Sequence, residues 1–134
     1  MDPRINALNM VKENGANLQM CLQYVDDEEI VMAAVSNFGL ALNFASDRLK
    51  NNTEIVMAAV KQNGKAIKYA NERFIHNKQM VVLALQHCNL FSINELMDSL
   101  DEDLKDDPEV EYASKESYDR QLRELEEANK ISRK

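Results

Sequence analysis

The stretch EEIVMAAVSNFGLALNFASDRLKN (residues 28–51) is followed almost at once by TEIVMAAVKQNGKAIKYANERFIH (residues 53–76). The seven residues EIVMAAV therefore recur after 25 positions. An Asp or Asn, which favours the N-cap of a helix, precedes each copy, and weaker copies extend the pattern in both directions. The N-cap candidates at this spacing are Asp2, Asp27, Asn52 and Asn77. The chain thus contains about three and a half copies of a 25-residue unit.

Each unit predicts a helix, a tight turn at glycine and a second helix. The alanines of IVMAAV and the preceding cap favour helix over strand for the first segment. We expect Gly39 and Gly64 to end that helix in the left-handed conformation, with positive φ. The second segment carries apolar residues at helical spacing, namely Ala41, Phe44, Ala45 and Leu49, matched by Ala66, Tyr69, Ala70 and Phe74.

The repetition itself predicts how the units pack. A pair of short helices cannot bury its own apolar surface, whereas stacked neighbouring pairs can. The predicted fold class is therefore all-α, a solenoid-like stack of these helix–turn–helix repeats with further helices at the C-terminal end.

After the repeats, the sequence predicts a capping helix. Ser92 and Glu95 have the spacing of a capping box, and Phe91 and Leu96 have the spacing of a hydrophobic staple. The predicted repeat domain, including this helix, spans residues 1–104.

The remaining residues, 105–134, are predicted to form an acidic linker and a terminal helix. The segment DEDLKDDPEVE (residues 101–111) is acidic and is interrupted by Pro108, which is typical of a solvated linker. From about Ser117, the residues Tyr118, Leu122 and Leu125 form a narrow apolar stripe on a charged helix. Such a stripe could pack on the repeats or on another chain.

Composition narrows the class of protein. A chain of 134 residues with 45% apolar residues can form one compact domain. The net charge is −7, and residues 101–134 hold 12 acidic against 7 basic residues, which disfavours nucleic-acid binding. No apolar run is long enough for a membrane span, and the first residues lack the features of a secretory signal. Two cysteines form no disulfide framework, so a cytoplasmic location is expected.

The sequence offers little apparatus for catalysis. Cys88 follows His87, but neighbours on a helix point about 100° apart, so His87 is poorly placed as its base. Cys21 occupies a position where the other copies have alanine, which indicates a core residue. Two histidines and two distant cysteines do not form a metal site, and the acidic segment lacks the glycine of an EF-hand. We therefore predict no catalytic residue, cofactor or metal.

Differences between the copies indicate where a partner could bind. Ser36, Leu40 and Asn43 of one copy are all replaced by lysine in the next. Repeat proteins use such a variable face for binding, although a merely solvated face would vary in the same way. The candidate partner-binding residues on this face are Leu40, Asn43, Lys61, Lys65 and Lys68. A rival site is the stripe of Tyr118, Leu122 and Leu125.

The motif that runs from Glu29 to Ala45 and again from Glu54 to Ala70 resembles a short helical repeat family of unknown function. That family occurs in proteins of Legionella and related bacteria, amoebae and giant viruses, and the resemblance covers roughly residues 5–90. The family has no established catalytic residues. The chain is also similar in size to small Legionella regulators that inhibit other effectors, including effectors with ubiquitin deamidase and transglutaminase activity. Its final glutamates, Glu124, Glu126 and Glu127, are similar to a type IV translocation signal, which implies transfer into a host cell.

Together these features predict a non-enzymatic protein–protein interaction module that inhibits or regulates a partner enzyme. The candidate partner is a bacterial effector enzyme, and neither nucleic acid nor membrane is expected to bind. Two alternatives remain open at this stage. One is a self-assembling structural or adaptor module, including a homodimer through the last helix, and the other is an enzyme that uses Cys88.

Overall fold

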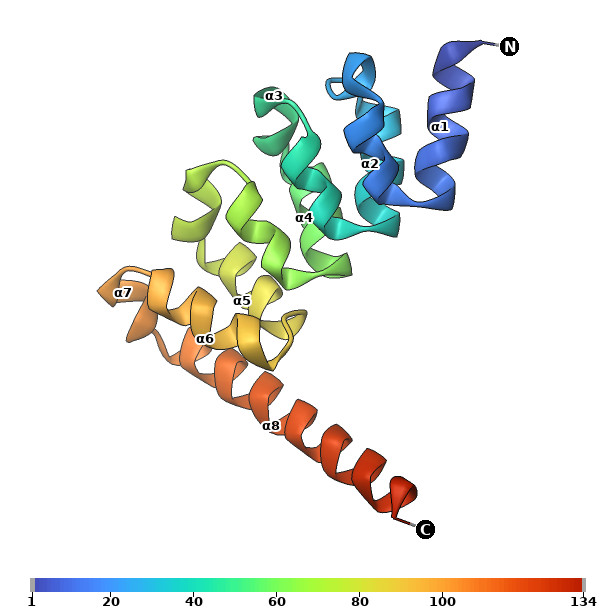
Figure 1. Cartoon of the computed structure of the whole chain (residues 1–134). Coiled ribbons are helices and arrows are strands. Elements are labelled where there is room, and N and C mark those ends of the chain that lie inside the picture. Colours follow the sequence, from blue (N-terminus) through green and yellow to red (C-terminus); the bar gives the residue numbers. More distant parts are fainter. Residues whose placement is uncertain (1, 134) are drawn as a thin grey trace.

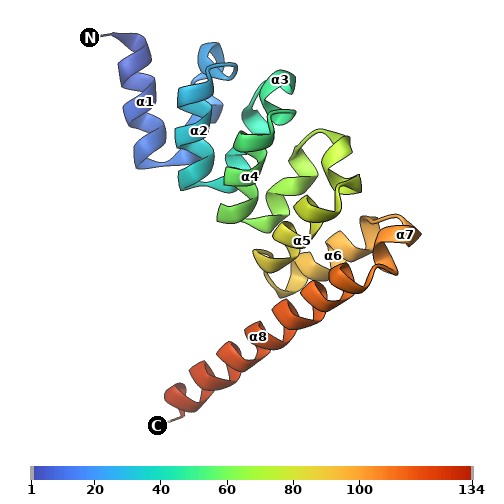
Figure 2. The ribbon, with the colours of Figure 1, turned by 180° about the vertical axis from the view of Figure 1, so that it is seen from behind.

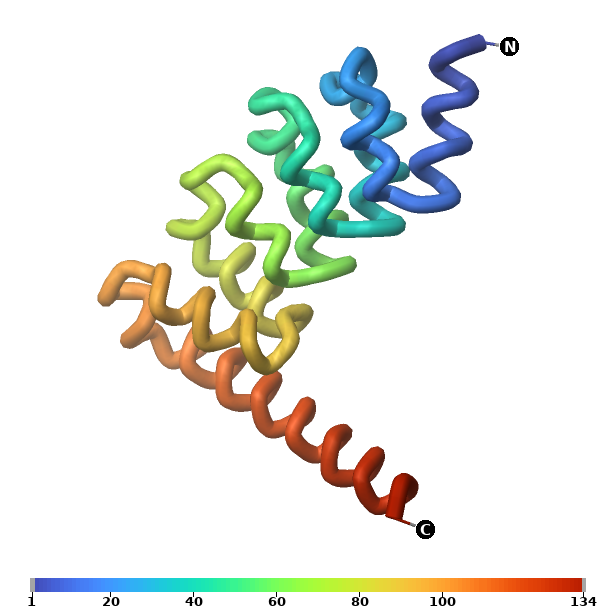
Figure 3. The backbone as a smooth tube through the Cα atoms, viewed as in Figure 1, coloured from blue at the N-terminus to red at the C-terminus, as the bar shows by residue number. Residues whose placement is uncertain are grey.

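The computed structural model describes residues 2–133 and consists of helices joined by short connections (Figure 1). Over these residues there is no strand, which confirms the all-α class. The helices follow one another in a staggered row, and the last one extends away from the others (Figures 1 and 3).

The first layer of the molecule contains α-helices that lie side by side in chain order (Figures 1 and 2). They are α1 (Pro3–Glu13), α2 (Glu28–Asn37), α4 (Thr53–Gln62) and α5 (Lys78–Gln86). The long helix α8 (Pro108–Ser132) packs against α5 at the end of this row. Each interior helix buries the same apolar positions, because it has neighbours on several sides. These positions include Ile30, Ile55 and Met80, and Val31, Val56 and Val81.

The second layer packs across the first and is built mainly from 3₁₀-helices. It contains η1 (Gly15–Met20), η3 (Gly39–Phe44), η4 (Gly64–Tyr69) and then α6 (Leu90–Ser99). Short elements return the chain to the first layer: η2 (Leu22–Tyr24), α3 (Asp47–Lys50), η5 (Glu72–His76) and α7 (Glu102–Lys105).

The predicted N-caps of the first-layer helices are confirmed. The side chain of Asp27 accepts a hydrogen bond from the backbone N–H of Ile30 at 3.2 Å, and Asn52 accepts one from Ile55 at the same distance. Asp2 and Asn77 cap α1 and α5 in the same way. A cap of this kind satisfies one of the free N–H groups of the first helical turn, so its position fixes where each helix begins.

The predicted second helix of each unit is wrong in type. After each glycine the chain forms a six-residue 3₁₀-helix and then an extended residue, Ala45 or Ala70. In η4 the N–H of Ala66 bonds to the carbonyl of Asn63 at 2.9 Å, three residues back. The apolar face expected on one helix therefore belongs to separate elements, because Ala41 lies in η3 and Leu49 in α3. Both residues are buried, so the predicted core was right although the element was not.

The prediction of positive φ at Gly39 and Gly64 is also wrong, since no residue among 2–133 has positive φ. The chain leaves α4 through the extended residue Asn63, with φ of −156°. Glycine is needed instead because its backbone lies very close to the backbone of another segment. A Cβ at Gly64 would lie within 3.0 Å of the backbone of Ala84 and Cys88, and the Gly64 N–H donates to the His87 carbonyl at 2.9 Å.

The predicted start of the capping helix is displaced. Helix α6 begins at Leu90, and its N-cap is Asn89, whose side chain accepts from the Ser92 N–H at 2.9 Å. Ser92 is buried inside the helix, and Phe91 is 88% exposed. The capping box and the staple are therefore not formed, because Asn89 caps the helix three residues earlier.

The predicted linker is helical. Residues 102–105 form α7, and Pro108 is the first residue of α8 rather than a break. Proline favours this position because its fixed φ suits a helix and its missing N–H needs no partner there. Asp107 caps the helix and pairs with Lys78 at 3.1 Å, while Val110 and Ala113 are buried. The first half of α8 is thus continuous with the packed layers, across the predicted boundary at residues 104 and 105.

Arginines 25 positions apart join successive turns, as the constancy of Arg48 and Arg73 between copies suggests. The guanidinium of Arg48 donates to the carbonyl of Asp26 at 2.9 Å, and that of Arg73 donates to the carbonyl of Asn51 at 2.9 Å. Arg48 also pairs with the Asp26 carboxylate at 2.9 Å. The hydrogen bond from the Ser46 hydroxyl, followed by that from Arg48, holds the pKa of this carboxyl below its usual range.

Candidate functional site

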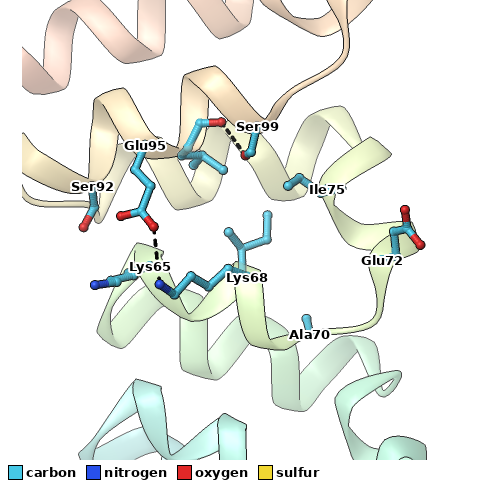
Figure 4. Close-up of a pocket in the computed structure, with 10 residues that line it drawn as sticks. Lys65, Lys68, Ala70, Glu72, Ile75, Ser92, Glu95 and Ser99 are labelled. Carbon is cyan, nitrogen blue, oxygen red and sulfur yellow. Dashed lines mark hydrogen bonds and ion pairs between the residues drawn. The ribbon is translucent and has the colours of Figure 1, made fainter.

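A cleft of about 260 Å³ opens in the second layer, between η4 and η5 on one side and α6 on the other (Figure 4). Both walls contribute apolar and polar side chains. The lining residues are Lys65, Ile67, Lys68, Ala70, Glu72, Ile75, Ser92, Glu95, Leu96 and Ser99.

The cleft lies where the second layer changes its type of helix. The elements η1, η3 and η4 are six-residue 3₁₀-helices that pack against one another, whereas the next element, α6, is a ten-residue α-helix. An α-helix is wider and rises less per residue than a 3₁₀-helix, so it cannot repeat the same close packing. Ser92, Leu96 and Ser99 lie on one side of α6 and form the opposite wall.

The interior of the cleft is apolar. Ile67 and Leu96 are almost fully buried beneath it, and Ala70 and Ile75 are half-buried beside them. Figure 4 shows Ile75 facing the cleft from the η5 wall. A ligand that enters here would exchange water for aliphatic contact, which is favourable by about 25 cal/mol per Å² of apolar surface removed from water.

Four charged side chains lie on the rim of the cleft. Two of them, Lys68 and Glu95, form an ion pair, and Lys65 and Glu72 lie apart from it. The Lys68 ammonium lies 3.4 Å from a carboxylate oxygen of Glu95 and 5.4 Å from the centre of the Tyr69 ring, so it bridges the two walls. Lys65 and Glu72 lie toward opposite sides of the close-up (Figure 4). Within residues 2–133 neither forms an ion pair shorter than 4.0 Å, so both keep their charge available to a ligand.

Two serine hydroxyl groups line the α6 wall, and they differ in their hydrogen bonding. The Ser99 hydroxyl donates to the Leu96 carbonyl at 2.7 Å. The Ser92 side chain is buried at the edge of the cleft, and its hydroxyl makes no hydrogen bond to any other described residue. Ser92 can therefore offer a hydrogen bond to a bound molecule without breaking one within the chain.

The structure brings together only part of the predicted variable face. Lys65 and Lys68 line the cleft, whereas Lys61 is exposed at the end of α4 and Asn43 is exposed on η3. Leu40 is half-buried and packs against the core. Of the predicted face, only Lys65 and Lys68 therefore line the cleft.

Sequence reasoning missed the wall that α6 provides. Ser92 and Glu95 were interpreted as a capping box, although Ser92, Leu96 and Ser99 also have the spacing of one helical face. Ile75 was not singled out because η5 was expected to be the end of a helix. That the two segments face each other depends on packing between units, which no local pattern reports.

The rival stripe on α8 is exposed. Tyr118, Leu122 and Leu125 are 40%, 37% and 51% exposed. Leu125 lines a groove with Phe91, at the junction of α8 with the start of α6. From Leu122 onward, every described residue of α8 is exposed, and this half of the helix projects beyond the layers (Figure 2).

A different face of α8 holds the helix to the body. Ala113 and Ser117 are buried against the first layer. Gln121 donates to the carbonyl of Cys88 at 2.6 Å, and Arg120 donates to the carbonyl of Gln86 at 2.9 Å. These side chains thus satisfy backbone carbonyls at the end of α5, which a helix leaves without partners of its own.

Cys88 is placed as a structural residue. It is 4% exposed, and burial, followed by the nearby Glu95 charge, raises the pKa of its thiol to about 12. A thiol with this pKa is almost entirely protonated at neutral pH, whereas the thiolate is the nucleophile. Cys21 is also buried, and burial raises the pKa of its thiol.

Two other kinds of site were sought in residues 2–133. No group of three or more His, Cys, Asp or Glu side chains lies close enough to hold a metal ion. None of the helices has both the length and the apolar character needed to cross a membrane.

Comparison with known proteins identifies one family. A family model described as a domain of unknown function (DUF4116) matches residues 27–75 and again residues 59–101. The two matches include all of η4, η5 and α6, and therefore the whole cleft. No curated protein and no solved structure matches the chain.

Proposed function

This chain belongs to the DUF4116 family of domains of unknown function, and we propose that it is a non-enzymatic protein-binding module that holds a segment of a partner protein in the cleft between η4, η5 and α6. The observation that carries this proposal is the combination of an apolar interior with a charged rim in one concave site. Ligand sites in proteins typically combine these features, with apolar walls for affinity and a few polar groups for orientation.

The scaffold around the cleft supports a binding role. The order of α-helix, glycine, 3₁₀-helix and turn recurs along the chain, and a short solenoid is the architecture we propose for it. In such proteins each unit contacts only its neighbours, and stacking produces an extended surface for binding. The change from η4 to α6 would then turn one junction of that surface into a specific site.

The regulatory part of the proposal concerns the partner. We propose that the partner is itself an enzyme, such as a ubiquitin-modifying bacterial effector. Occupation of the cleft by a segment of that enzyme would inhibit it. A cytoplasmic site of action, after translocation into a host cell, belongs to the same proposal.

A second candidate function is self-association through α8. The exposed side chains of Tyr118, Leu122 and Leu125, with Phe91 beside them, favour it, because apolar residues gathered on one surface often mark an interface. Light scattering on the whole chain tests this candidate. A dimer that becomes a monomer in Leu122→Asp would support it, and a monomer at every protein concentration would exclude it.

The experiment for the main proposal is affinity capture with quantitative mass spectrometry, from lysates of the source organism and of a host cell. The test variant is Lys65→Glu with Ile75→Asp, which changes the cleft. The matched control is Lys61→Glu, which makes one of the same charge changes on the neighbouring exposed surface. Both proteins should retain the circular dichroism of the wild type.

We expect the same partner to be captured by the wild type and by Lys61→Glu, and to be lost with the cleft variant. Equal capture by all three proteins would exclude the cleft as the binding site. Leu40→Asp is unsuitable as a test, because Leu40 packs against the core and its replacement would change stability as well as binding.

A further inference from the structure

We infer that the cleft selects a peptide segment in which an aliphatic side chain lies between an acidic and a basic side chain. The inference rests on the proposed function and adds the chemistry of the segment. It follows from the arrangement of charge along the cleft, from the apolar space between the charges and from the Ser92 hydroxyl.

Within residues 2–133, the rim carries unpaired charges of opposite sign at its two ends. Lys68 and Glu95 neutralise each other across the cleft at 3.4 Å. The remaining charges are Lys65, in the first turn of η4, and Glu72, in the first turn of η5, and they lie toward opposite sides of Figure 4. A segment with a carboxylate near Lys65 and a cation near Glu72 matches this pattern. A segment with two acidic or two basic ends meets a like charge at one end, which disfavours binding.

The space between the two ends requires apolar atoms. Its volume of about 260 Å³ is far larger than the roughly 10–15 Å³ that a single water molecule needs on a comparable measure. Ile67, Ile75 and Leu96 surround it with aliphatic carbon. A charged side chain here would lose its hydration without gaining a partner, so an aliphatic side chain is preferred.

Ser92 adds a polar contact on the α6 wall. Its hydroxyl is free of hydrogen bonds to the rest of the described chain, and the residue lines the cleft (Figure 4). It can donate to a backbone carbonyl of the bound segment or accept from a backbone N–H. A peptide offers both groups at every residue, which favours a peptide over a purely apolar ligand.

The segment is also expected to be foreign to this chain. The exposed half of α8 presents glutamates and arginines around Leu122 and Leu125 without a single acid-to-base order along its stripe. A second copy of α8 therefore matches the polarity of the cleft less well than a segment with one charge at each end.

The test is selection of displayed random linear peptides on the whole chain. The wild type is compared with Lys65→Glu, which leaves both ends of the cleft acidic and alters only a half-buried side chain of the rim. Peptides enriched on the wild type should carry an acidic and a basic residue on either side of an aliphatic residue. Peptides enriched on Lys65→Glu should carry a basic residue on both sides of the aliphatic residue.

Synthetic versions of the enriched peptides then allow affinity to be measured by calorimetry. Ile75→Asp should weaken binding at least about tenfold, and Ser92→Ala should weaken it by a smaller factor. Enrichment of the same charges on both proteins, or of peptides without charge, would overturn the inference. Enrichment of sequences that match residues 118–130 would also overturn it, in favour of a second copy as the occupant.

The two experiments distinguish failure of this inference from failure of the proposed function. If the natural partner is lost with the cleft variant but peptide selection shows no charge preference, the proposed function stands and the inference fails. If the natural partner binds the cleft variant normally, the proposed function fails, whatever the peptides show.

Discussion

Replacement of Gly64 by alanine tests how the two layers are held together. The Gly64 N–H donates to the His87 carbonyl at 2.9 Å, so the backbone of η4 lies directly against the end of α5. A Cβ at this position would meet the Ala84 carbonyl oxygen and the Cys88 backbone N and Sγ at less than 3.0 Å. Because two of these atoms belong to the backbone, no side-chain rotation can relieve the contact.

The magnitude follows from three contributions. Overpacking of a close contact costs about 1–3 kcal/mol, and a weakened backbone hydrogen bond costs about 0.5–1.5 kcal/mol. The alanine also restricts the unfolded chain, which returns about 0.4–1 kcal/mol. We therefore expect the free energy of unfolding to fall by about 2–3 kcal/mol. For a chain of 134 residues, this corresponds to a decrease in melting temperature of roughly 6–15 °C.

The assay is urea unfolding followed by circular dichroism, with Gly64→Asn as the discriminating variant. If glycine were required for positive φ, asparagine would be tolerated better than alanine, because asparagine adopts that conformation more readily. With close approach as the reason, asparagine should destabilise at least as much as alanine. A Gly64→Ala protein within about 0.5 kcal/mol of the wild type, or a clear rescue by asparagine, would refute the close-contact explanation.

Four further predictions concern separate parts of the molecule. Asn52→Ala should lower the free energy of unfolding by about 1 kcal/mol, measured by urea unfolding, because it removes the N-cap of α4. Ala113→Glu should release α8, seen as faster amide hydrogen exchange over residues 108–121, because it forces a charge into a buried contact. Lys78 holds the pKa of the Asp107 carboxyl below its ordinary value of about 3.9, so the carboxylate stabilises the fold above that pH and loses this effect as pH falls through the lower, folded value. The difference in unfolding free energy between the wild type and Asp107→Asn should therefore shrink below about pH 4, and a difference that grew there would contradict the pairing. Because its thiol has a pKa of about 12, Cys88 should react with iodoacetamide far more slowly in the folded chain than in urea. A thiol that is protonated at neutral pH is not a nucleophile, so Cys88→Ala should leave partner binding intact.

Sequence reasoning succeeded where local chemistry decides the structure. Asp27 and Asn52 cap their helices as predicted, because a cap depends on residues within one helical turn. Burial of Ile30 and Ile55 follows from the same register. Arg48 and Arg73, which are identical in the two copies, each donate to a backbone carbonyl of the preceding turn.

It failed where two distant segments decide the structure. Gly64 resembles a helix-ending glycine in the sequence, yet its role depends on the carbonyl of Ala84 in the next unit. Pro108 resembles a helix breaker, but Asp107 before it and the surface of α5 beneath it allow a helix to begin there.

The sequence predicted only one wall of the candidate site, because the other wall also depends on contacts between distant segments. The replacement of Leu40 by Lys65 indicated an accessible position, and Lys68 was found with it in the cleft. The other wall depends on α6 taking the place of a 3₁₀-helix, which changes the spacing between neighbouring elements of the second layer and not the local pattern of the sequence.

The central claim, that the cleft holds a partner protein, is tested most directly by photo-crosslinking. A benzophenone amino acid is placed at Ile75, inside the cleft, or at Lys61 or Tyr118, outside it, and each whole chain is irradiated in the lysate used for capture. We predict a covalent adduct with one partner from position 75 and none with that partner from positions 61 and 118. An adduct from position 118 or 61 without one from position 75 would contradict the claim and place binding on α8 or on the exposed face of α4.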